Sequence, residues 1–116
     1  MLRGDQPIIN GNGKQTRDFV YVDDVVNAFI LAIKKNKIGV YNIGTGKEAT
    51  INTIFLKLKQ LTGSNCKKIH GPRKPGEQRR SCLDYSKAKK ELGWIPKVSL
   101  DEGLRITVEW FKENLE

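Results

Sequence analysis

The sequence predicts a small mixed α/β fold, and three features of the chain support this. Short apolar runs of the strand type alternate with longer segments whose apolar residues keep helical spacing. Asn-Gly and Gly-rich turns separate these segments. The 116 residues suffice for one domain, since a chain of this size buries roughly two thirds of the surface that its unfolded form exposes. We therefore expect residues 1–116 to form a single domain around one core.

Three short strands are expected in the first half of the chain. Their predicted ranges are residues 7–10, 19–22 and 38–43. The first range ends in two Asn-Gly steps, Asn10-Gly11 and Asn12-Gly13, which are strong turn signals. The third is followed by a Gly-Thr-Gly turn at 44–46. One or two further extended pieces are expected in the loop-rich segment 64–84.

Four helices are expected, and each has a recognisable boundary. They are predicted from Asp24 to about residue 36, between the cap Thr50 and Gly63, between the cap Ser86 and Gly93, and from Leu100 onward. Asp23 or Asp24 is expected to cap the first helix, because a short polar side chain there accepts a hydrogen bond from the first turn. Ser99 and Glu102 form a capping box at the start of the last helix.

The first helix is apolar around most of its circumference. In its segment VVNAFILAI only Asn27 is polar, which indicates burial on several sides. A chain of this size has few elements with which to wrap such a helix. Either it is the central helix here, or it packs against a partner outside this chain. In the second case we expect an exposed apolar patch around Val25, Phe29 and Ile33, which self-association through helix 24–36 would cover.

The net charge of +8 favours an anionic partner, either a nucleic acid or the diphosphate of a small ligand. The basic residues gather at 34–37, 67–80 and 87–90. No aromatic residues interleave these clusters in the way that a base-stacking platform requires. We therefore expect no nucleic-acid partner, and a basic interaction protein that binds RNA stays the alternative.

Membrane and metal chemistry have little support in the sequence. No apolar run approaches the roughly 20 residues that span a bilayer, so we expect no membrane association and a cytoplasmic location. The side chains most suited to a structural zinc lack the spacing of such a site: Cys66, His70 and Cys82. No bound metal is expected.

A series of ordered motifs carries a family resemblance. The segment GNGKQTRDFVYVDDVVNAFILA at 11–32 is followed by YNIG at 41–44 and by LDYSKAKKELGW at 83–94. In this order the motifs resemble the carboxyl-terminal, substrate-binding region of extended short-chain dehydrogenases that epimerise or dehydrate nucleotide sugars. The resemblance is strongest to the UDP-glucose 4-epimerase-like group, and it covers essentially the whole chain.

The resemblance implies an NAD-dependent parent enzyme whose Rossmann cofactor domain is absent from this chain. Such a parent binds NAD on that domain, oxidises the sugar at C4 through a Tyr/Lys pair and returns the hydride to the opposite face. The isolated chain would bind no cofactor, hold no catalytic residue and be inactive. Two alternatives stay open: a fragment of a 4,6-dehydratase or decarboxylase, and a stand-alone nucleotide-sugar binding module.

The resemblance also implies how the ligand, a UDP- or dTDP-sugar, is bound. Arg17 matches a family arginine that contacts the diphosphate, and a planar guanidinium suits bidentate phosphate contact. On the residues alone, an ion pair is the alternative, with Asp18, Asp23 or Asp24 as its partner. The base edge, uracil or thymine, would be read by the backbone of Pro7, Ile8 and Ile9.

A second contact segment is the loop GPRKPGEQRRSCLD at 71–84, which resembles the family's Arg-Pro-Gly-Asp loop. Lys74 stands where the family usually has arginine, so it neutralises phosphate without a bidentate fork, and Arg73 would take part of that role. Glu77 stands for the family's aspartate and would accept hydrogen bonds from ribose hydroxyls. Surface solvation is expected for Arg79 and Arg80.

Two motifs mimic a cofactor or catalytic site. The segment GTGKEA at 44–49 has the glycine spacing of a dinucleotide fingerprint but lacks the acidic residue roughly 20 positions later. Tyr85 and Lys89 have the Tyr-x-x-x-Lys spacing of the family's catalytic pair. The surrounding sequence instead matches a distal family segment, in which Asp84 and Trp94 would cap or pack. We expect neither motif to take part in catalysis.

Overall fold

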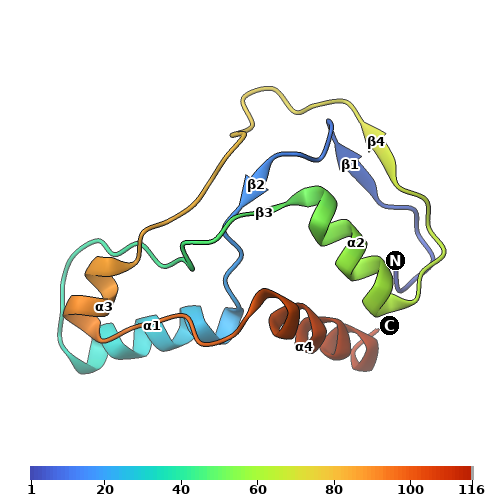
Figure 1. Cartoon of the computed structure of the whole chain (residues 1–116). Helices are drawn as coiled ribbons and strands as arrows, with labels where there is room; N and C mark the ends of the chain where they lie inside the picture. Colours follow the sequence, from blue (N-terminus) through green and yellow to red (C-terminus); the bar gives the residue numbers. More distant parts are fainter. Residues whose placement is uncertain (116) are drawn as a thin grey trace.

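The computed structural model of the chain describes residues 1–115 and shows a mixed α/β fold (Figure 1). The elements follow in the order β1 (Ile8–Asn10), β2 (Thr16–Arg17), α1 (Val22–Lys34), β3 (Ala49–Thr50), α2 (Ile51–Thr62), β4 (Ile69–Gly71), α3 (Ser86–Leu92) and α4 (Leu100–Glu113). The predicted fold class is confirmed, with most of the regular backbone in the helices.

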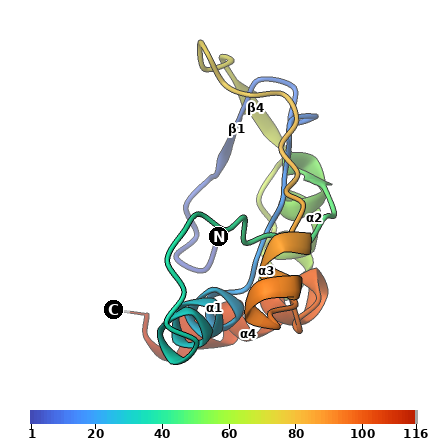
Figure 2. The ribbon, with the colours of Figure 1, turned by 90° about the vertical axis from the view of Figure 1, so that its left-hand side faces the viewer.

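The strands form two separate pairs, and the helices pack in two separate pairs as well. β1 lies parallel to β4, with Ile9 opposite His70, and β2 lies antiparallel to β3, with Thr16 opposite Thr50. α2 packs against α4, and α1 packs against α3. Figures 1 and 2 show the result: α1 and α3 lie at one end of the molecule, and β1, β4 and α2 lie at the other.

The chain is elongated rather than spherical. Its Cα radius of gyration is 16.4 Å, compared with about 13 Å for a compact domain of this length. The buried side chains are divided accordingly. One cluster, formed by Ala28, Ala88, Leu92 and Trp94, lies between α1 and α3. Buried apolar residues at the other end are Ile9, Phe55 and Val108. The main buried cluster therefore lies at the α1 and α3 end, and a smaller number of buried apolar residues lie at the other end.

Most of the predicted helix boundaries are confirmed. The Thr50 side chain accepts a hydrogen bond from the backbone N–H of Thr53, and the helix ends at Gly63 in the left-handed conformation. The Ser99 side chain accepts a hydrogen bond from the backbone N–H of Glu102 at the start of α4. Short polar side chains at these positions satisfy amides that a helix leaves free at its first turn.

The start of α3 differs from the prediction in which residue supplies the cap. Ser86 is the first helical residue, and the residue before it is the N-cap. The N-cap residue makes no side-chain cap hydrogen bond; instead the Ser86 backbone N–H, at 2.9 Å, and its hydroxyl both donate to the Asp84 carboxylate. Hydrogen bonds from Ser86 also lower the pKa of Asp84 below its usual range. Asp84 therefore organises the turn into α3, and Gly93 ends this helix as predicted.

The first helix is displaced towards the amino terminus, and its cap is not an aspartate. α1 runs over Val22–Lys34 with Tyr21 as the N-cap, so the predicted capping role of Asp23 or Asp24 is wrong. Asp24 lies within the first turn and is buried. Its carboxylate instead accepts the backbone N–H groups of residues 97–98 at 3.1 and 3.0 Å. A buried carboxylate needs such partners, and the segment before α4 supplies them.

Two predicted strands are absent or displaced. The strand expected at 19–22 lies earlier, at Thr16–Arg17, where β3 supplies its hydrogen-bonding partner. The segment 38–43 pairs with no other described segment and is not a strand. Its Ile38 and Val40 are 97% and 83% exposed. A strand needs a neighbour for its N–H and C=O groups, which this segment lacks within residues 1–115. The strand at 7–10 and an extended piece in the later loop are confirmed as β1 and β4.

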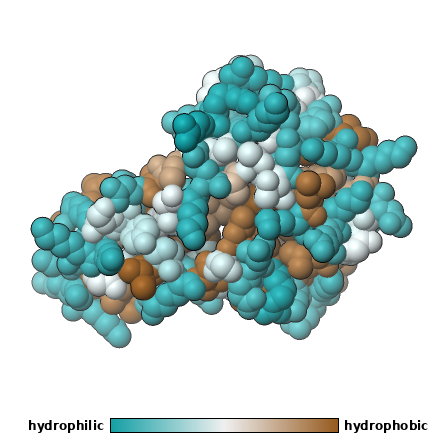
Figure 3. Space-filling view, in the orientation of Figure 1, coloured by the Kyte–Doolittle hydropathy of each residue, from teal (hydrophilic) through white to brown (hydrophobic). Residues whose placement is uncertain are grey.

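One face of α1 is apolar and exposed. Its exposed residues are Val22, Val26, Phe29, Ile30 and Ile33. Phe29 and Ile33 are 67% and 78% exposed, as the sequence predicts, whereas Val25 is half-buried, so Val26 takes its place in the patch. The first alternative, a central helix wrapped by other elements of this chain, is therefore not met within the described residues. Figure 3 shows apolar residues interrupting the hydrophilic surface at this end. None of the helices within residues 1–115 combines the length and apolarity that crossing a membrane requires.

Candidate functional site

A long connection, residues 72–84, arches from β4 towards α3 and passes alongside β2 (Figure 1). We call this connection the strap. Backbone bonds hold it to β2, where the Thr16 N–H donates to the Arg79 carbonyl at 2.8 Å. Further along, the Leu83 N–H donates to the Asp18 carboxylate at 3.2 Å. The strap is therefore held in place by residues that lie more than sixty positions away in the sequence.

Arg17 occupies the space between β2 and the strap. Its Nη1 donates to the carbonyls of Thr16 at 2.6 Å and Gln78 at 2.8 Å. Its Nη2 lies 3.5 Å from Oε1 of Glu77, and the two side chains are 32% and 23% exposed. The carboxylate beside Arg17 is thus supplied by the strap, and not by one of the three aspartates that the sequence suggested as partners. Arg17 and Glu77, two predicted site residues, are brought together.

Asp18 ties three segments together next to Arg17. Its carboxylate accepts hydrogen bonds from the Thr45 N–H and hydroxyl, from the Gly46 N–H and from the Leu83 N–H. Burial raises the pKa of Asp18, but these hydrogen bonds outweigh burial and place the pKa below its usual range. Gly44 is required in this turn, because a Cβ there would lie 2.6 Å from Leu83 Cβ and 2.7 Å from Asp18 Oδ2.

A cavity of about 280 Å³ adjoins β1. Pro7–Ile9 and Glu77 both line it, so the strand proposed to read the base and the acid proposed to bind ribose share one cavity. Apolar side chains of α2 form its other wall: Ile51, Ile54, Phe55 and Leu58. Gln15 also lines the cavity and is buried; its Nε2 donates to the Asn10 carbonyl at 2.9 Å, and its Oε1 finds no partner among residues 1–115.

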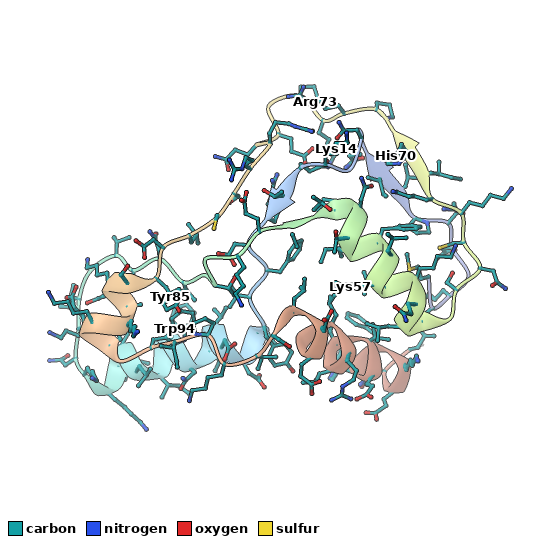
Figure 4. All side chains as sticks on the ribbon, viewed as in Figure 1. Lys14, Lys57, His70, Arg73, Tyr85 and Trp94 are labelled. Carbon is teal, nitrogen blue, oxygen red and sulfur yellow. The ribbon has the colours of Figure 1, made fainter. Side chains whose placement is uncertain are left out.

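The other two predicted contacts, Arg73 and Lys74, lie on the exposed crest of the strap. Arg73 packs over Gly11, where an added Cβ would meet Arg73 Cβ at 3.4 Å. Figure 4 shows Arg73, Lys14 and His70 at the same end of the molecule. Within the described residues neither Arg73 nor Lys74 has a carboxylate partner. We call the end that carries β1, β4, α2 and this crest the strap end. It therefore presents positive charge without a carboxylate partner among residues 1–115.

Sequence reasoning missed two contacts that fix the strap. Arg80, expected to be solvated, makes a bidentate ion pair with Glu48 at 2.7 and 3.1 Å. Hydrogen bonds from Arg80 and Thr16 lower the pKa of Glu48 to about 2. Arg79 donates to the Asn12 side chain at 3.0 Å. The only sequence signal was a run of basic residues, which does not say which distant partner each one finds.

The comparisons with known proteins place this geometry in a family. Residues 1–107 match the model of the GDP-mannose 4,6-dehydratase family. A putative UDP-glucose 4-epimerase of Methanocaldococcus jannaschii is 45% identical over 98% of this chain and 37% of its own length. The crystal structure of the Thermotoga maritima UDP-glucose 4-epimerase with UDP-glucose matches with a TM-score of 0.94 and 52% identity, covering 100% of this chain and 38% of that one. The chain belongs to the extended short-chain dehydrogenase family of nucleotide-sugar epimerases and dehydratases.

The family resemblance predicted from the sequence is confirmed, and the matched part is the carboxyl-terminal region. The chain spans a little over a third of the length of the relatives it matches. Other relatives include a UDP-glucuronic acid decarboxylase and a dTDP-glucose 4,6-dehydratase. The structure of the Bacillus cereus UDP-glucuronic acid 4-epimerase, which is in complex with NAD, matches with a TM-score of 0.83 and 33% identity, covering 100% of this chain and 37% of that one.

The two motifs that resemble a cofactor loop and a catalytic pair, residues 44–49 and Tyr85 with Lys89, make structural contacts in this chain. The amides of Thr45 and Gly46, which a dinucleotide phosphate would need, are bonded to Asp18. Tyr85 packs edge-on against Trp94, with ring centroids 5.7 Å apart. Figure 4 shows this pair far from the end that carries Arg73. Within residues 1–115, no three Cys, His, Asp or Glu side chains gather as a metal site would require.

Proposed function

We propose that residues 1–116 form the nucleotide-sugar-binding domain of an NAD-dependent NDP-sugar epimerase, most similar to the UDP-glucose 4-epimerases. The observation that carries this proposal is Arg17, half-exposed beneath the strap and flanked by Glu77. Its two short bonds both come from Nη1, so Nε makes no bond within the described residues and Nη2 has only the 3.5 Å contact with Glu77, which a phosphate bound to both nitrogens would displace. A guanidinium fixed by backbone carbonyls is already oriented for a bidentate phosphate contact.

The charge of the strap supports a diphosphate as the ligand. Arg73 and Lys74 have no carboxylate partners within residues 1–115, so their charges attract an anion instead of being neutralised internally. Cations that gather on one surface raise the local concentration of an anionic ligand. Arg73 offers a planar fork and Lys74 a point charge, so we assign the stronger phosphate contact to Arg73.

The nucleoside is assigned to the cavity beside β1. Within the described residues β1 pairs with a strand, β4, on one edge only, although the Asn10 and Pro7 carbonyls already accept the side-chain amides of Gln15 and Gln6. The remaining backbone groups on the other edge can pair with the polar edge of a uracil or thymine ring. Glu77 lines the same cavity and has the acceptors that ribose hydroxyls need.

We assign NAD to a Rossmann domain outside these residues. The one glycine turn that resembles a cofactor loop does not fit a phosphate, because Asp18 already accepts its amides. When bound to the parent enzyme, NAD would supply reversible oxidation of the sugar. Residues 1–116 would contribute binding and orientation, and the chain alone would be inactive. A 4,6-dehydratase or decarboxylase uses the same binding chemistry and stays the second candidate, favoured by the relatives of those kinds.

The exposed apolar face of α1 is assigned to the interface with that Rossmann domain. The matched relatives are nearly three times as long as the matched region, which is enough chain for a cofactor domain. Exposed apolar faces of this kind mark protein interfaces. In a chain of these 116 residues alone, we expect the same face to self-associate.

Calorimetric titration with UDP, UDP-glucose, dTDP and a short RNA tests the proposal. We expect heat with the nucleotides and none with the RNA. Arg17→Ala should weaken UDP binding roughly tenfold or more, since a hydrogen-bonded charge contact is lost. Arg17→Lys should retain part of the affinity. Arg105→Ala is the matched control, because Arg105 on α4 is bonded to Glu102 and Glu109. An Arg17→Ala variant that binds UDP as tightly as the unmodified chain would exclude the assigned role.

A further inference from the structure

Glu77 has two neighbours. Its carboxylate lies 3.5 Å from Nη2 of Arg17, and the residue also lines the cavity bounded by Pro7–Ile9. Its backbone is fixed by a tight turn, in which the Glu77 N–H donates to the Lys74 carbonyl and Gly76 is left-handed. Glu77 can therefore change partner by rotating its side chain, while the strap keeps its course.

The ion pair between Arg17 and Glu77 is loose compared with others in the same chain. Charge-assisted N–H···O bonds usually measure about 2.7–2.9 Å, and both the Arg80–Glu48 pair and the Arg105–Glu102 pair are that short or shorter. The 3.5 Å separation at Arg17 lies outside that range. Glu77 thus lies where an anion would contact Nη2 of Arg17, but it makes only a long, weak bond there.

We propose that Glu77 makes Arg17 selective for nucleoside diphosphates over bare phosphate anions. The inference rests on the proposed function, since it assumes that Arg17 binds the diphosphate. A phosphate anion and the Glu77 carboxylate compete for the same N–H groups. An incoming pyrophosphate must displace the carboxylate and leave it without a partner. In a nucleoside diphosphate, the ribose hydroxyls can donate to the displaced Glu77 carboxylate and so replace Arg17 as its partner.

The length of the Glu77 side chain suits this exchange. A glutamate reaches one methylene further than an aspartate, so one carboxylate can serve both Arg17 and the cavity from a fixed backbone. The charge balance points the same way. Removing the Glu77 charge would leave Arg17 without a carboxylate partner, as Arg73 and Lys74 on the strap already are, and these cations attract any small phosphate anion.

Calorimetric titrations with pyrophosphate and with UDP test the inference on the unmodified chain and on Glu77→Gln. Glu77→Gln should bind pyrophosphate more tightly, because the competing carboxylate is gone, and UDP no more tightly, because the ribose hydroxyls lose a charged acceptor and keep only a neutral amide oxygen. The ratio of UDP affinity to pyrophosphate affinity should therefore fall about tenfold, the loss of one charge-assisted contact.

The control is Glu109→Gln. Glu109 lies on α4, away from the strap, where it pairs with Arg105, and its removal changes the net charge equally. This control should leave the affinity ratio within about threefold of the unmodified chain, well below the loss of one charge-assisted contact. Glu77→Asp keeps the charge but shortens the reach by one methylene, so it should retain only part of the selectivity; a ratio between those of the unmodified chain and Glu77→Gln also guards against a folding defect in Glu77→Gln.

Three outcomes would overturn the inference, and they separate it from the proposed function. If Glu77→Gln and Glu109→Gln raise pyrophosphate affinity equally, the effect is only that of net charge. If UDP binds the unmodified chain but the ratio is unchanged in Glu77→Gln, Glu77 has no selective role while the proposed function stands. If neither the unmodified chain nor any variant binds UDP, the proposed function and the selectivity fail together.

Discussion

The two ends of this molecule are stabilised by different interactions, and each leaves a different kind of surface without a partner. The strap end buries only a few apolar residues, Ile9, Phe55 and Val108, and is held in addition by hydrogen bonds and ion pairs that run from Arg17, Asp18 and Glu48 to distant segments. The end formed by α1 and α3 is held by apolar packing around Trp94. The strap end presents unpaired cations, whereas the α1 end presents an uncovered apolar face. Water solvates the first surface readily and the second poorly.

This difference indicates which of the two surfaces, the basic strap or the apolar face of α1, has its binding geometry before a partner is bound. A basic surface tolerates solvent, so the strap can hold its binding geometry before any ligand arrives. An exposed apolar face of several large side chains favours association with another surface. In the proposed function, ligand binding therefore depends on charge at the strap end and domain docking on apolar contact at the α1 end. A substitution at one end should affect one of these two and leave the other unchanged.

The largest expected effect is at the α1 end. Trp94 is fully buried, and its indole N–H donates to the Asp24 carbonyl at 2.8 Å. Trp94→Ala should lower the free energy of unfolding by about 3–5 kcal/mol, the usual cost of removing a large buried aromatic side chain. Urea denaturation followed by circular dichroism measures this. Trp110→Ala on α4 is the control, since Trp110 is largely exposed and its removal should cost far less. Equal costs for the two variants would contradict the assigned core.

The next largest effect is at the strap end. Asp18→Asn should lower the free energy of unfolding by about 2 kcal/mol, because an amide cannot accept all of the N–H groups that the carboxylate accepts. Hydrogen exchange should speed up at the amides of Thr45, Gly46 and Leu83, which donate to Asp18. Asp5→Asn is a control at an exposed position. An Asp18 variant with unchanged exchange at these three amides would show that the strap is fixed without them.

The pH dependence of the Asp18 effect has a defined sign. The pKa of Asp18 lies below its ordinary value of 3.8, so the carboxylate is more acidic in the folded chain than in the unfolded chain. Its stabilisation is therefore complete above about pH 4 and is lost as the pH falls through the folded pKa. The difference in stability between the unmodified chain and Asp18→Asn should shrink below that pH.

The helices could be predicted from the sequence because their signals are local. Thr50, Gly63, Ser99 and Gly93 each mark a boundary within a few residues of the hydrogen bond or conformation that they create. The strands could not be placed as well. The run 38–43 has strand composition, but a strand also needs a neighbour, and no described segment supplies one.

The candidate site was predicted through family motifs rather than through geometry. Arg17 and Glu77 were each identified, yet their contact was not, because sixty positions separate them and no local pattern links them. Asp18 was read only as an alternative partner for Arg17. Its real partners, Thr45, Gly46 and Leu83, donate through backbone amides, which leave no side-chain signature in the sequence.

The smallest expected effect on stability comes from the apolar face of α1, although its effect on association should be clear. Phe29→Gln combined with Ile33→Gln should change the free energy of unfolding by no more than about 0.5 kcal/mol per site, since both side chains are already exposed and glutamine favours helix. Sedimentation velocity should show the unmodified chain associating and the double variant monomeric.

Trp110→Gln separates the α1 face from exposed apolar surface in general. Trp110 is another large exposed side chain, located on α4 at the opposite end of the molecule from α3. If association depends on the α1 face, Trp110→Gln should associate like the unmodified chain. If both variants lose association equally, the contact is not specific to α1. An unmodified chain that is monomeric and binds no hydrophobic dye would instead contradict self-association through the α1 face. The two ends would then differ in how their interiors are packed and not in their tendency to associate.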